Sequence, residues 1–294
     1  MAFCPAHVTG FFKAELGNQN QKTNELGSLG AGFSIQDGVT TTVEVTPAKE
    51  FDFKITTEGY SSENTSVSEY VINDFIKRCN SKYFINVNHE ISVPVGYGLG
   101  SSGAVALSLS VALNKALNLS LTKEQVGEIA HNAEVMCKTG LGDVLASYHG
   151  GFEIRTKAGA PGIGVVEKID TDSNVILICF SPISTRKFIS EKIETINGLG
   201  GKMVNQLRKT RDYNDFQDMS IEFSKYVQVL TPKMESVVND LHNAGIKCGV
   251  ALFGETIFAM IPPTMEQRVL DVLKKYDDGI IIKSRIDNSG VRLE

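Results

Sequence analysis

Tryptophan, paired cysteines and long apolar runs are all missing from this 294-residue chain. Its five cysteines are odd in number, widely scattered and never in a C-x-x-C pair, which argues against a disulfide framework and a zinc site and predicts reduced thiols. No window approaches the roughly 18 apolar residues of a membrane span. The N-terminus lacks a basic segment followed by an apolar run. We therefore expect a cytoplasmic protein that is neither exported nor inserted in a membrane.

An excess of basic residues is also missing. The formal net charge is −5 and the lysines and arginines are spread along the chain, so nucleic acid and acidic membranes are not expected as partners. With 42% apolar residues, the chain can bury a large core in one large or two moderate domains. A negatively charged ligand must then be held by a local site rather than by the overall field.

The first half of the chain predicts a helix over 68–79 and a strand that ends at Pro94, and between them the apolar spacing changes from helical to alternating. A helix that is apolar on most faces is expected over 104–117. Thr122 and Gln125 form a capping box for a further helix that runs to about Lys138. The segment GLGD interrupts this helix, and a strand is expected to resume in SYHGGFEIR.

The second half predicts a strand at 175–180, helices at 185–196, 199–211, 214–229 and 232–243, and two strands joined at Gly254-Glu255. A helix with a capping box from Thr264 to Gln267 and a last strand, GIIIKSRI, follow. Without the extra helices the order is β-α-β-β-α-β, the ferredoxin-like pattern. We therefore expect an α+β chain with domains at 1–165 and 166–294.

The stretch Gly98-Leu-Gly-Ser-Ser-Gly103 fits the dinucleotide fingerprint G-x-G-x-x-G. A dinucleotide site also needs an acidic residue at the end of a second strand about 20 residues on, but here the next element is another helix. A P-loop fails because no lysine follows the glycines. What remains is a loop of backbone N–H groups at the start of a buried helix, which favours phosphate. The alternative is a tight turn whose glycines serve only close packing.

The residues around this loop, PVGYGLGSSGA, resemble the P-x-x-x-G-L-G-S-S-[AG]-A motif of the GHMP kinases, the family of galactokinase, homoserine kinase, mevalonate kinase and phosphomevalonate kinase. The resemblance implies the GHMP-kinase fold, with an N-terminal domain like domain 2 of ribosomal protein S5 and a C-terminal ferredoxin-like domain. It also implies that ATP is bound in the cleft between the domains and that Ser102 contacts a magnesium ion. The ATP-binding residues it implies are Pro94, Gly98, Leu99, Gly100, Ser101, Ser102 and Gly103.

Phosphoryl transfer needs neutralisation of the phosphates and a residue that orients or deprotonates the attacking hydroxyl. Two acids stand out, Glu134 in the helix before GLGD and Asp143 in TGLGDVLASYHGG. The resemblance implies that Glu134 is the magnesium ligand and Asp143 the base. We expect Asp143 to orient the hydroxyl first and to capture its proton late, because an alcohol is far less acidic than a carboxylic acid of pKa about 4. The alternatives are a solvated helix glutamate and an aspartate that caps a helix.

Further segments, CPAHVTGFFK, GSLGAGFSI, AHNAE and GGFEIRT, resemble the archaeal pantoate kinases, a branch of this family that works in coenzyme A biosynthesis. The resemblance covers essentially the whole chain and implies phosphorylation of pantoate to 4-phosphopantoate. Members of this branch are commonly dimers, although no self-complementary surface can be named from the sequence.

A small dihydroxy carboxylate such as pantoate needs a cation and polar groups around it. Arg155 suits the carboxylate, and Ser28, His131 and His7 are the other candidates for contact with the substrate. Each has an alternative role, as a paired strand arginine, a turn serine or a surface histidine. His7 stands where several relatives carry a lysine near the phosphates, so Lys13 or Arg155 must assist it, or the metal must carry more of the charge.

Three further questions stay open at the level of sequence. The segment from Gly249 to Ala259 resembles the family's third motif, but with only two glycines it could equally be a plain hairpin. Arg155 suits any carboxylate, so homoserine, shikimate or mevalonate is an alternative substrate. A non-catalytic nucleotide sensor on the same fold is the alternative from another class, and a dehydrogenase ranks last.

Overall fold

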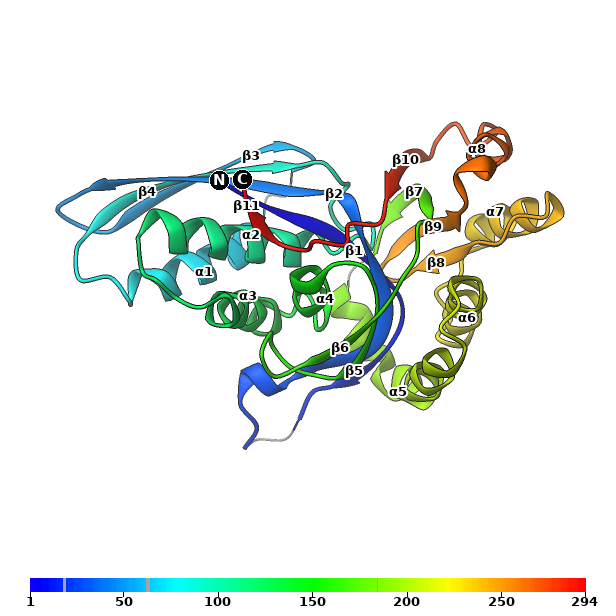
Figure 1. Cartoon of the computed structure of the whole chain (residues 1–294), viewed down its shortest axis with the longest axis horizontal. Helices are drawn as coiled ribbons and strands as arrows, with labels where there is room; N and C mark the ends of the chain where they lie inside the picture. The colour runs from blue at the N-terminus through cyan, green and yellow to red at the C-terminus, as the bar shows by residue number, and fades with distance from the viewer. Residues whose placement is uncertain (18–19, 62–63, 184) are drawn as a thin grey trace.

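The structure, a computed structural model, describes residues 1–17, 20–61, 64–183 and 185–294. Two β-sheets lie side by side, each with helices packed against it (Figure 1). The mixed composition confirms the α+β class expected from the sequence. Within the described residues no helix is long and apolar enough to cross a membrane.

The larger sheet has the order β11-β1-β2-β4-β3, and β5 and β6 extend it from β2. Its strands are β1 (Ala2–Glu15), β2 (Gly27–Pro47), β3 (Asp52–Gly59), β4 (Tyr83–Ile91), β5 (Phe152–Lys157), β6 (Val165–Ile169) and β11 (Arg292–Leu293). The 21 residues of β2 pair with β1, β4 and β5 in turn, so one long strand joins both ends of the sheet. A 3-10 turn, η1 (Thr23–Glu25), precedes β2.

Four helices pack on one side of this sheet (Figure 1): α1 (Ser66–Ile76), α2 (Ser101–Ala116), α3 (Lys123–Cys137) and α4 (Asp143–His149). The expected apolar helix is α2, and ten of its residues are buried between the sheet and α1 and α3. The capping box predicted for α3 is confirmed, since the Thr122 hydroxyl accepts from the Gln125 N–H. The first turns of α2 and α4 and the end of α3 point to one region, where the candidate site lies.

The smaller sheet has the order β10-β7-β9-β8, with strands β7 (Asn174–Pro182), β8 (Gly249–Ala251), β9 (Gly254–Ile261) and β10 (Ile280–Arg285). Its helices are α5 (Thr185–Thr210), α6 (Tyr213–Tyr226), α7 (Pro232–Asn243) and α8 (Glu266–Leu273), the last preceded by the 3-10 turn η2 (Pro263–Met265). The strand order and antiparallel pairing are those expected of the ferredoxin-like pattern.

Three local expectations were wrong. The two helices predicted at 185–196 and 199–211 are one helix, α5, because the Asn197 side chain bonds the backbone of Ala14 and Gly200 lets the helix approach the Phe12 carbonyl. The segment expected to resume as a strand after GLGD first forms α4. The predicted capping box at Thr264 is absent from the described residues, because Thr264 lies in η2 and α8 begins two residues later.

The predicted boundary between two domains, 1–165 and 166–294, stays a prediction. In the structure β6 still belongs to the larger sheet, and the chain returns to that sheet at β11. One hydrophobic core joins the two sheets, with the Phe33 and Phe258 ring centroids 4.9 Å apart. The two halves of the chain therefore pack against each other through this shared core.

Candidate active site

The glycine loop between β4 and α2 is shaped by two glycines in the left-handed region. Gly98 has φ 79° and Gly100 has φ 59°, values that residues with a Cβ rarely adopt. A Cβ at Gly98 would lie 2.3 Å from the Leu252 carbonyl oxygen, so the loop also requires glycine for close packing. The first N–H groups of α2, from Ser101 onward, have no partner within the helix and present a partial positive charge.

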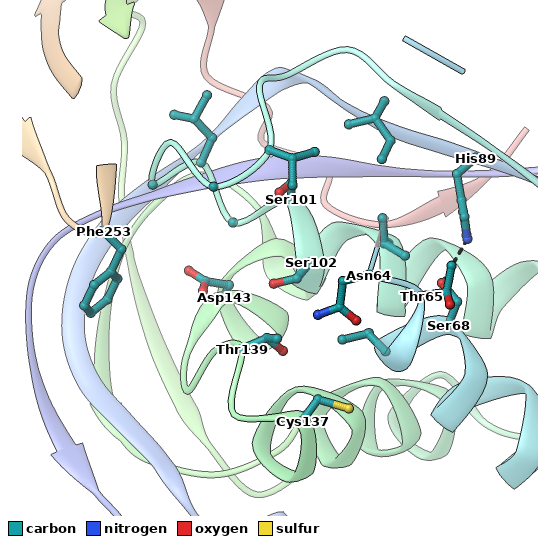
Figure 2. A pocket seen from close by; sticks show the side chains of 18 of the residues that line it. Asn64, Thr65, Ser68, His89, Ser101, Ser102, Cys137, Thr139, Asp143 and Phe253 are labelled. Carbon is teal, nitrogen blue, oxygen red and sulfur yellow. Dashed lines mark hydrogen bonds between the residues drawn. The ribbon is translucent and has the colours of Figure 1, made fainter. Parts of the chain in front are cut away.

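This loop lines a cavity of about 420 Å³ (Figure 2). Gly98, Leu99, Gly100, Ser101 and Ser102 form one wall. The opposite end is lined by β3, the start of α1 and His89 of β4, whose pKa burial lowers to about 4. A neutral His89 ring hydrogen-bonds the hydroxyls of Thr41 and Ser68. The cavity thus has the backbone N–H groups of the glycine loop and α2 at one end and an uncharged lining near His89 at the other.

The end of α3 contributes a buried carboxylate and a cation. Glu134 is 2% exposed, and Thr139 donates to its Oε1 at 2.6 Å, while Oε2 has no hydrogen-bond partner among the described residues. Burial, assisted by the charge of Asp143, raises the pKa of Glu134 to about 7. Lys138, in the left-handed region at φ 58°, is the one lysine or arginine among the described residues that line the large cavity.

Asp143 opens α4 and meets a chain of buried charges. Its Oδ1 lies 2.9 Å from His7 Nδ1, and His7 Nε2 lies 2.9 Å from Glu153 Oε1. Arg155 Nη1 donates to the same Glu153 oxygen at 2.5 Å. Burial acts to raise the pKa of Asp143, but the hydrogen bond and charge of His7 and the charge of Arg155 outweigh it and hold that pKa below its ordinary value.

A second, smaller cavity lies on the other side of Asp143. It measures about 20 Å³, room for one water molecule, and is lined by Thr9, Ser28, Asp143, Arg155 and hydrophobic neighbours. Arg155 is 1% exposed, and its Nε, which has no partner among the described residues, lies near Gly142 beside the Ser28 hydroxyl. Thr9, Asp143 and Phe253 line both cavities, and Figure 2 shows Phe253 beyond Asp143 from Ser102.

The structure brings most of the predicted residues together, but it gives some of them supporting positions. Pro94 and Gly103 do not line either cavity, and a Cβ at Gly103 would lie 3.1 Å from the Asp143 Cβ. His131 is buried and donates from Nε2 to the Leu26 carbonyl, just before Ser28, and burial lowers its pKa to about 4. His7 is fully buried behind Asp143 and lines neither cavity.

The alternatives for the two acids do not hold. Glu134 is buried rather than solvated, and the Asp143 carboxylate contacts His7 rather than capping α4. Neither Lys13 nor Arg155 replaces the positive charge of the lysine that several relatives carry at the position of His7. Lys13 is paired with Glu15 at 2.6 Å, and Arg155 is paired with Glu153. Gly140 keeps the two acids accessible, since a Cβ there would lie within about 3.1 Å of Asp143 Oδ2 and closer still to Glu134 Oε2.

The β8–β9 hairpin closes one side of the site. Its strands are joined by Leu252-Phe253 rather than by Gly254-Glu255, because Phe253 adopts the left-handed conformation at φ 65°. The Leu252 N–H donates to the Thr9 carbonyl, and the Thr256 hydroxyl donates to the Tyr97 carbonyl. The hairpin thus packs on the glycine loop, and Leu252 and Phe253 line the large cavity.

Four residues of the site escaped the sequence reasoning: Thr139, Glu153, Lys138 and Phe253. Thr139 and Lys138 adjoin GLGD, and Glu153 stands two residues before Arg155 on the same face of β5, so a strand period of 2 was a usable signal. No sequence signal pointed to Phe253, because glycine rather than phenylalanine is expected at a left-handed turn.

Comparisons with known proteins agree with this geometry. Residues 67–151 match the family model of the GHMP kinases N terminal domain. The chain is 35% identical over 279 residues to a pantoate kinase of Methanocaldococcus jannaschii, covering 92% of this chain and 96% of that protein. A pantoate kinase of Thermococcus kodakarensis is 27% identical, with 97% and 96% covered. A solved structure, described as a phosphotransferase related to the CoA biosynthesis pathway, superposes with a TM-score of 0.88 at 24% identity, covering 99% of this chain and 97% of that one.

Proposed function

The chain belongs to the GHMP kinase family, within its pantoate kinase branch, and we propose that it transfers the terminal phosphoryl group of ATP to the primary hydroxyl of pantoate. The observation that carries the proposal is the position of Asp143. Its carboxylate forms part of the wall of a large cavity with a phosphate-binding loop and of a small cavity with a buried arginine. An acceptor hydroxyl beside Asp143 would therefore face the end of the triphosphate.

ATP would occupy the large cavity with its triphosphate over Gly98 to Ser102. The free N–H groups at the start of α2 and the helix dipole favour phosphate there. Lys138 would add the positive charge that His7, buried behind Asp143, is not placed to supply to the phosphates. The neutral lining near His89 suits a nucleobase, which carries no charge at neutral pH.

Ser102 and Glu134 would hold a magnesium ion. The unpartnered Oε2 of Glu134 fits this role, as does a donor set limited to oxygen. Among the described residues no group of three or more His, Cys, Asp or Glu side chains is suited to a metal, and phosphate oxygens and water would complete the coordination. A bound magnesium ion would neutralise part of the phosphate charge that develops during transfer.

Asp143 would orient the hydroxyl and accept its proton late in the transfer. The hydroxyl oxygen forms a bond to the γ-phosphorus, the bond from that phosphorus to the β,γ-bridging oxygen breaks, and the hydroxyl proton passes to the Asp143 carboxylate. Because the neighbouring cations hold the pKa of Asp143 low, it is ionised and ready to accept at neutral pH. ADP leaves with the electron pair of the broken bond.

The acceptor would be recognised through Arg155 and Ser28. A guanidinium can donate to a carboxylate from Nε as well as from its terminal nitrogens, and the unpartnered Nε of Arg155 lies near Gly142, which also lines the small cavity. Ser28 offers a hydroxyl at the same wall, and His131 would hold the backbone that leads into it. Because the small cavity has room for only one water molecule, the acceptor would also occupy the adjoining part of the large cavity.

The product, 4-phosphopantoate, would enter coenzyme A biosynthesis, in line with the description of the superposed phosphotransferase. The expected homodimer and cytoplasmic location stay predictions. Size-exclusion chromatography with light scattering would test the first of these.

The test is ATP-dependent phosphorylation of pantoate, homoserine, shikimate, mevalonate and galactose, with Asp143→Asn run beside the wild type. Turnover of pantoate alone, lost in the variant, is expected. Turnover of another acceptor alone would overturn the substrate and keep the reaction. ATP binding without any turnover would favour a nucleotide sensor.

A further inference from the structure

We propose that His7 is a positioning residue, a doubly protonated imidazole that bridges Glu153 and Asp143 and ties the acceptor of the hydroxyl proton to the nucleotide loop. The inference deepens the proposed function and rests on it for its kinetic part. It concerns a side chain that lines neither cavity, so its effect on the reaction must pass through Asp143.

When both neighbouring acids are ionised, the geometry points to two ring protons. Each nitrogen of His7 lies 2.9 Å from a carboxylate oxygen, Nδ1 from Asp143 and Nε2 from Glu153. An ionised carboxylate only accepts hydrogen bonds, and a neutral imidazole carries a single N–H. Only the imidazolium donates to both acids. Both bonds are then charge-assisted, the stronger class of hydrogen bond.

The polar groups that face His7 come from three elements, and the charges among them alternate in sign. Glu153 and Arg155 face it from β5, Asp143 faces it from α4, and Thr9 lies beside it on β1 with its hydroxyl 3.4 Å from Nδ1. Glu134 on α3 acts on Asp143 rather than on His7. Two anions and two cations sum to zero, which suits a fully buried site. Burial alone would lower the pKa of His7, but the two carboxylates together raise it.

The backbone of His7 provides the link to the nucleotide. Its N–H donates to the Leu99 carbonyl at 3.1 Å, in the middle of the glycine loop. Glycines surround the residue: a Cβ at Gly100 would lie 3.0 Å from the His7 carbonyl oxygen, and a Cβ at Gly32 would lie 2.5 Å from Nε2. One residue therefore fixes both the loop and Asp143 relative to β1.

The role differs from that of a proton relay. Because both ring nitrogens already carry protons, His7 has no site for the hydroxyl proton, which stays on Asp143 until the product leaves. His7 instead sets the direction of the Asp143 carboxylate and keeps it ionised. Glu153 would keep His7 charged, and Arg155, whose own charge acts against protonation of His7, would hold Glu153 in place.

The first test does not depend on activity or on the substrate. In the ligand-free protein labelled with ¹⁵N at its five histidines, one ring should show two protonated nitrogens at pH 8, well above the ordinary histidine pKa of about 6.5. That signal should vanish in His7→Gln and shift in Glu153→Gln. A His7 ring with one protonated nitrogen at pH 7 would overturn the proposal, and this readout needs only folded wild-type protein.

The second test uses two substitutions of His7, each of which keeps only one of its two hydrogen bonds to the acids. The amide of His7→Asn would reach Asp143 but not Glu153, and that of His7→Gln would reach Glu153 but not Asp143. We expect kcat for pantoate to fall about 10-fold in the first and about 100-fold in the second, within the range of general acid–base effects, with KM changed less than about 3-fold. The acidic limb of the kcat profile should move to higher pH in both, because Asp143 loses its cation.

The exposed His242→Gln is the matched control and should leave all parameters unchanged. An equal loss of kcat at every pH, with the acidic limb in place, would indicate a merely structural role and overturn the proposal. If the wild type does not turn over pantoate, the proposed substrate fails, while the nitrogen signals still decide the state of His7.

Discussion

The end of α3 and the start of α4 each bring a carboxylate to the first turn of α2, yet the two acids are held in opposite states. Measured from the Cβ position at Gly103, Glu134 Oε2 lies 3.4 Å away and the Asp143 Cβ lies 3.1 Å away. The pKa of Glu134 is raised to about 7, whereas that of Asp143 is lowered. Burial acts upward on both pKa values, so the neighbours decide the outcome.

The difference lies in the chemistry of those neighbours. Glu134 receives a neutral hydroxyl from Thr139 and feels the negative charge of Asp143. Asp143 contacts His7 and lies near Arg155. A carboxyl surrounded by hydroxyls gains its charge when a cation binds, and a carboxylate surrounded by cations is charged beforehand. The first environment suits a metal ligand, and the second suits a group that must accept a proton.

The largest expected effect comes from Asp143→Asn, which removes the carboxylate on the α4 side while preserving the shape of the side chain. The amide cannot take the hydroxyl proton, so kcat for pantoate should fall about 10³-fold or more. Steady-state kinetics measure this loss, and calorimetry with a non-hydrolysable ATP analogue should show binding within a few-fold of wild type. A variant with more than a tenth of the wild-type kcat would exclude Asp143 as the proton acceptor.

Glu134→Gln replaces the carboxyl group at the end of α3 by a permanently neutral amide and should have opposite effects on activity and stability. Activity should fall about 10²-fold through loss of the metal ligand. The metal-free protein should gain stability, because ionising a fully buried glutamate disfavours the folded state. A pKa raised from 4.5 to about 7 corresponds to a gain on the order of 3 kcal/mol.

The sign of this gain depends on pH. Below pH 4.5 the carboxyl is protonated in both folded and unfolded chains, so wild type and Glu134→Gln should unfold at similar urea concentrations. Between pH 4.5 and 7 the unfolded chain ionises first, and the wild type loses stability relative to the variant until the difference is complete near pH 8. Urea unfolding at pH 4.5 and 8 measures it. An equal difference at both values would remove the ionisation of Glu134 as the cause.

Arg155→Lys tests whether Arg155 acts beside Asp143 through its positive charge or through the shape of its guanidinium. Lysine keeps the positive charge beside Glu153 but loses the fork and Nε. The acidic limb of the kcat profile should therefore stay in place, while KM for pantoate rises about 10- to 100-fold, the equivalent of a hydrogen bond to a charged group. An unchanged KM for pantoate would remove Arg155 from acceptor recognition.

The sequence predicted the glycine loop before α2 better than the charge chain around Asp143. Strand, glycine loop and helix are contiguous in the chain, so the phosphate-binding geometry around Gly98 and Gly100 follows from local rules. The charge chain joins β1, α4 and β5, and His7 lies 136 residues from Asp143. No local rule pairs residues that far apart, so the motifs named His7 and Asp143 without revealing that they touch. The same reason explains α5, where the break predicted between residues 196 and 199 is absent because Asn197 and Gly200 contact β1.

The smallest expected effect is that of Lys138→Ala, at the end of α3 beside the large cavity. Because this side chain is exposed, its attraction for a phosphate is partly screened, and a loss of about 0.5–1 kcal/mol is expected. KM for ATP should rise about 3- to 5-fold at low salt, and the difference should shrink as salt increases. KM for pantoate should not change, since Lys138 does not line the small cavity.

Lys115→Ala, at the far end of α2 and outside both cavities, is the matched control. If KM for ATP rose equally in both variants, the effect would come from net charge rather than from a phosphate contact of Lys138. A rise confined to Lys138→Ala would assign that contact to the α3 side, which would then supply both the metal ligand and the cation for the nucleotide, while the α4 side acts on the acceptor.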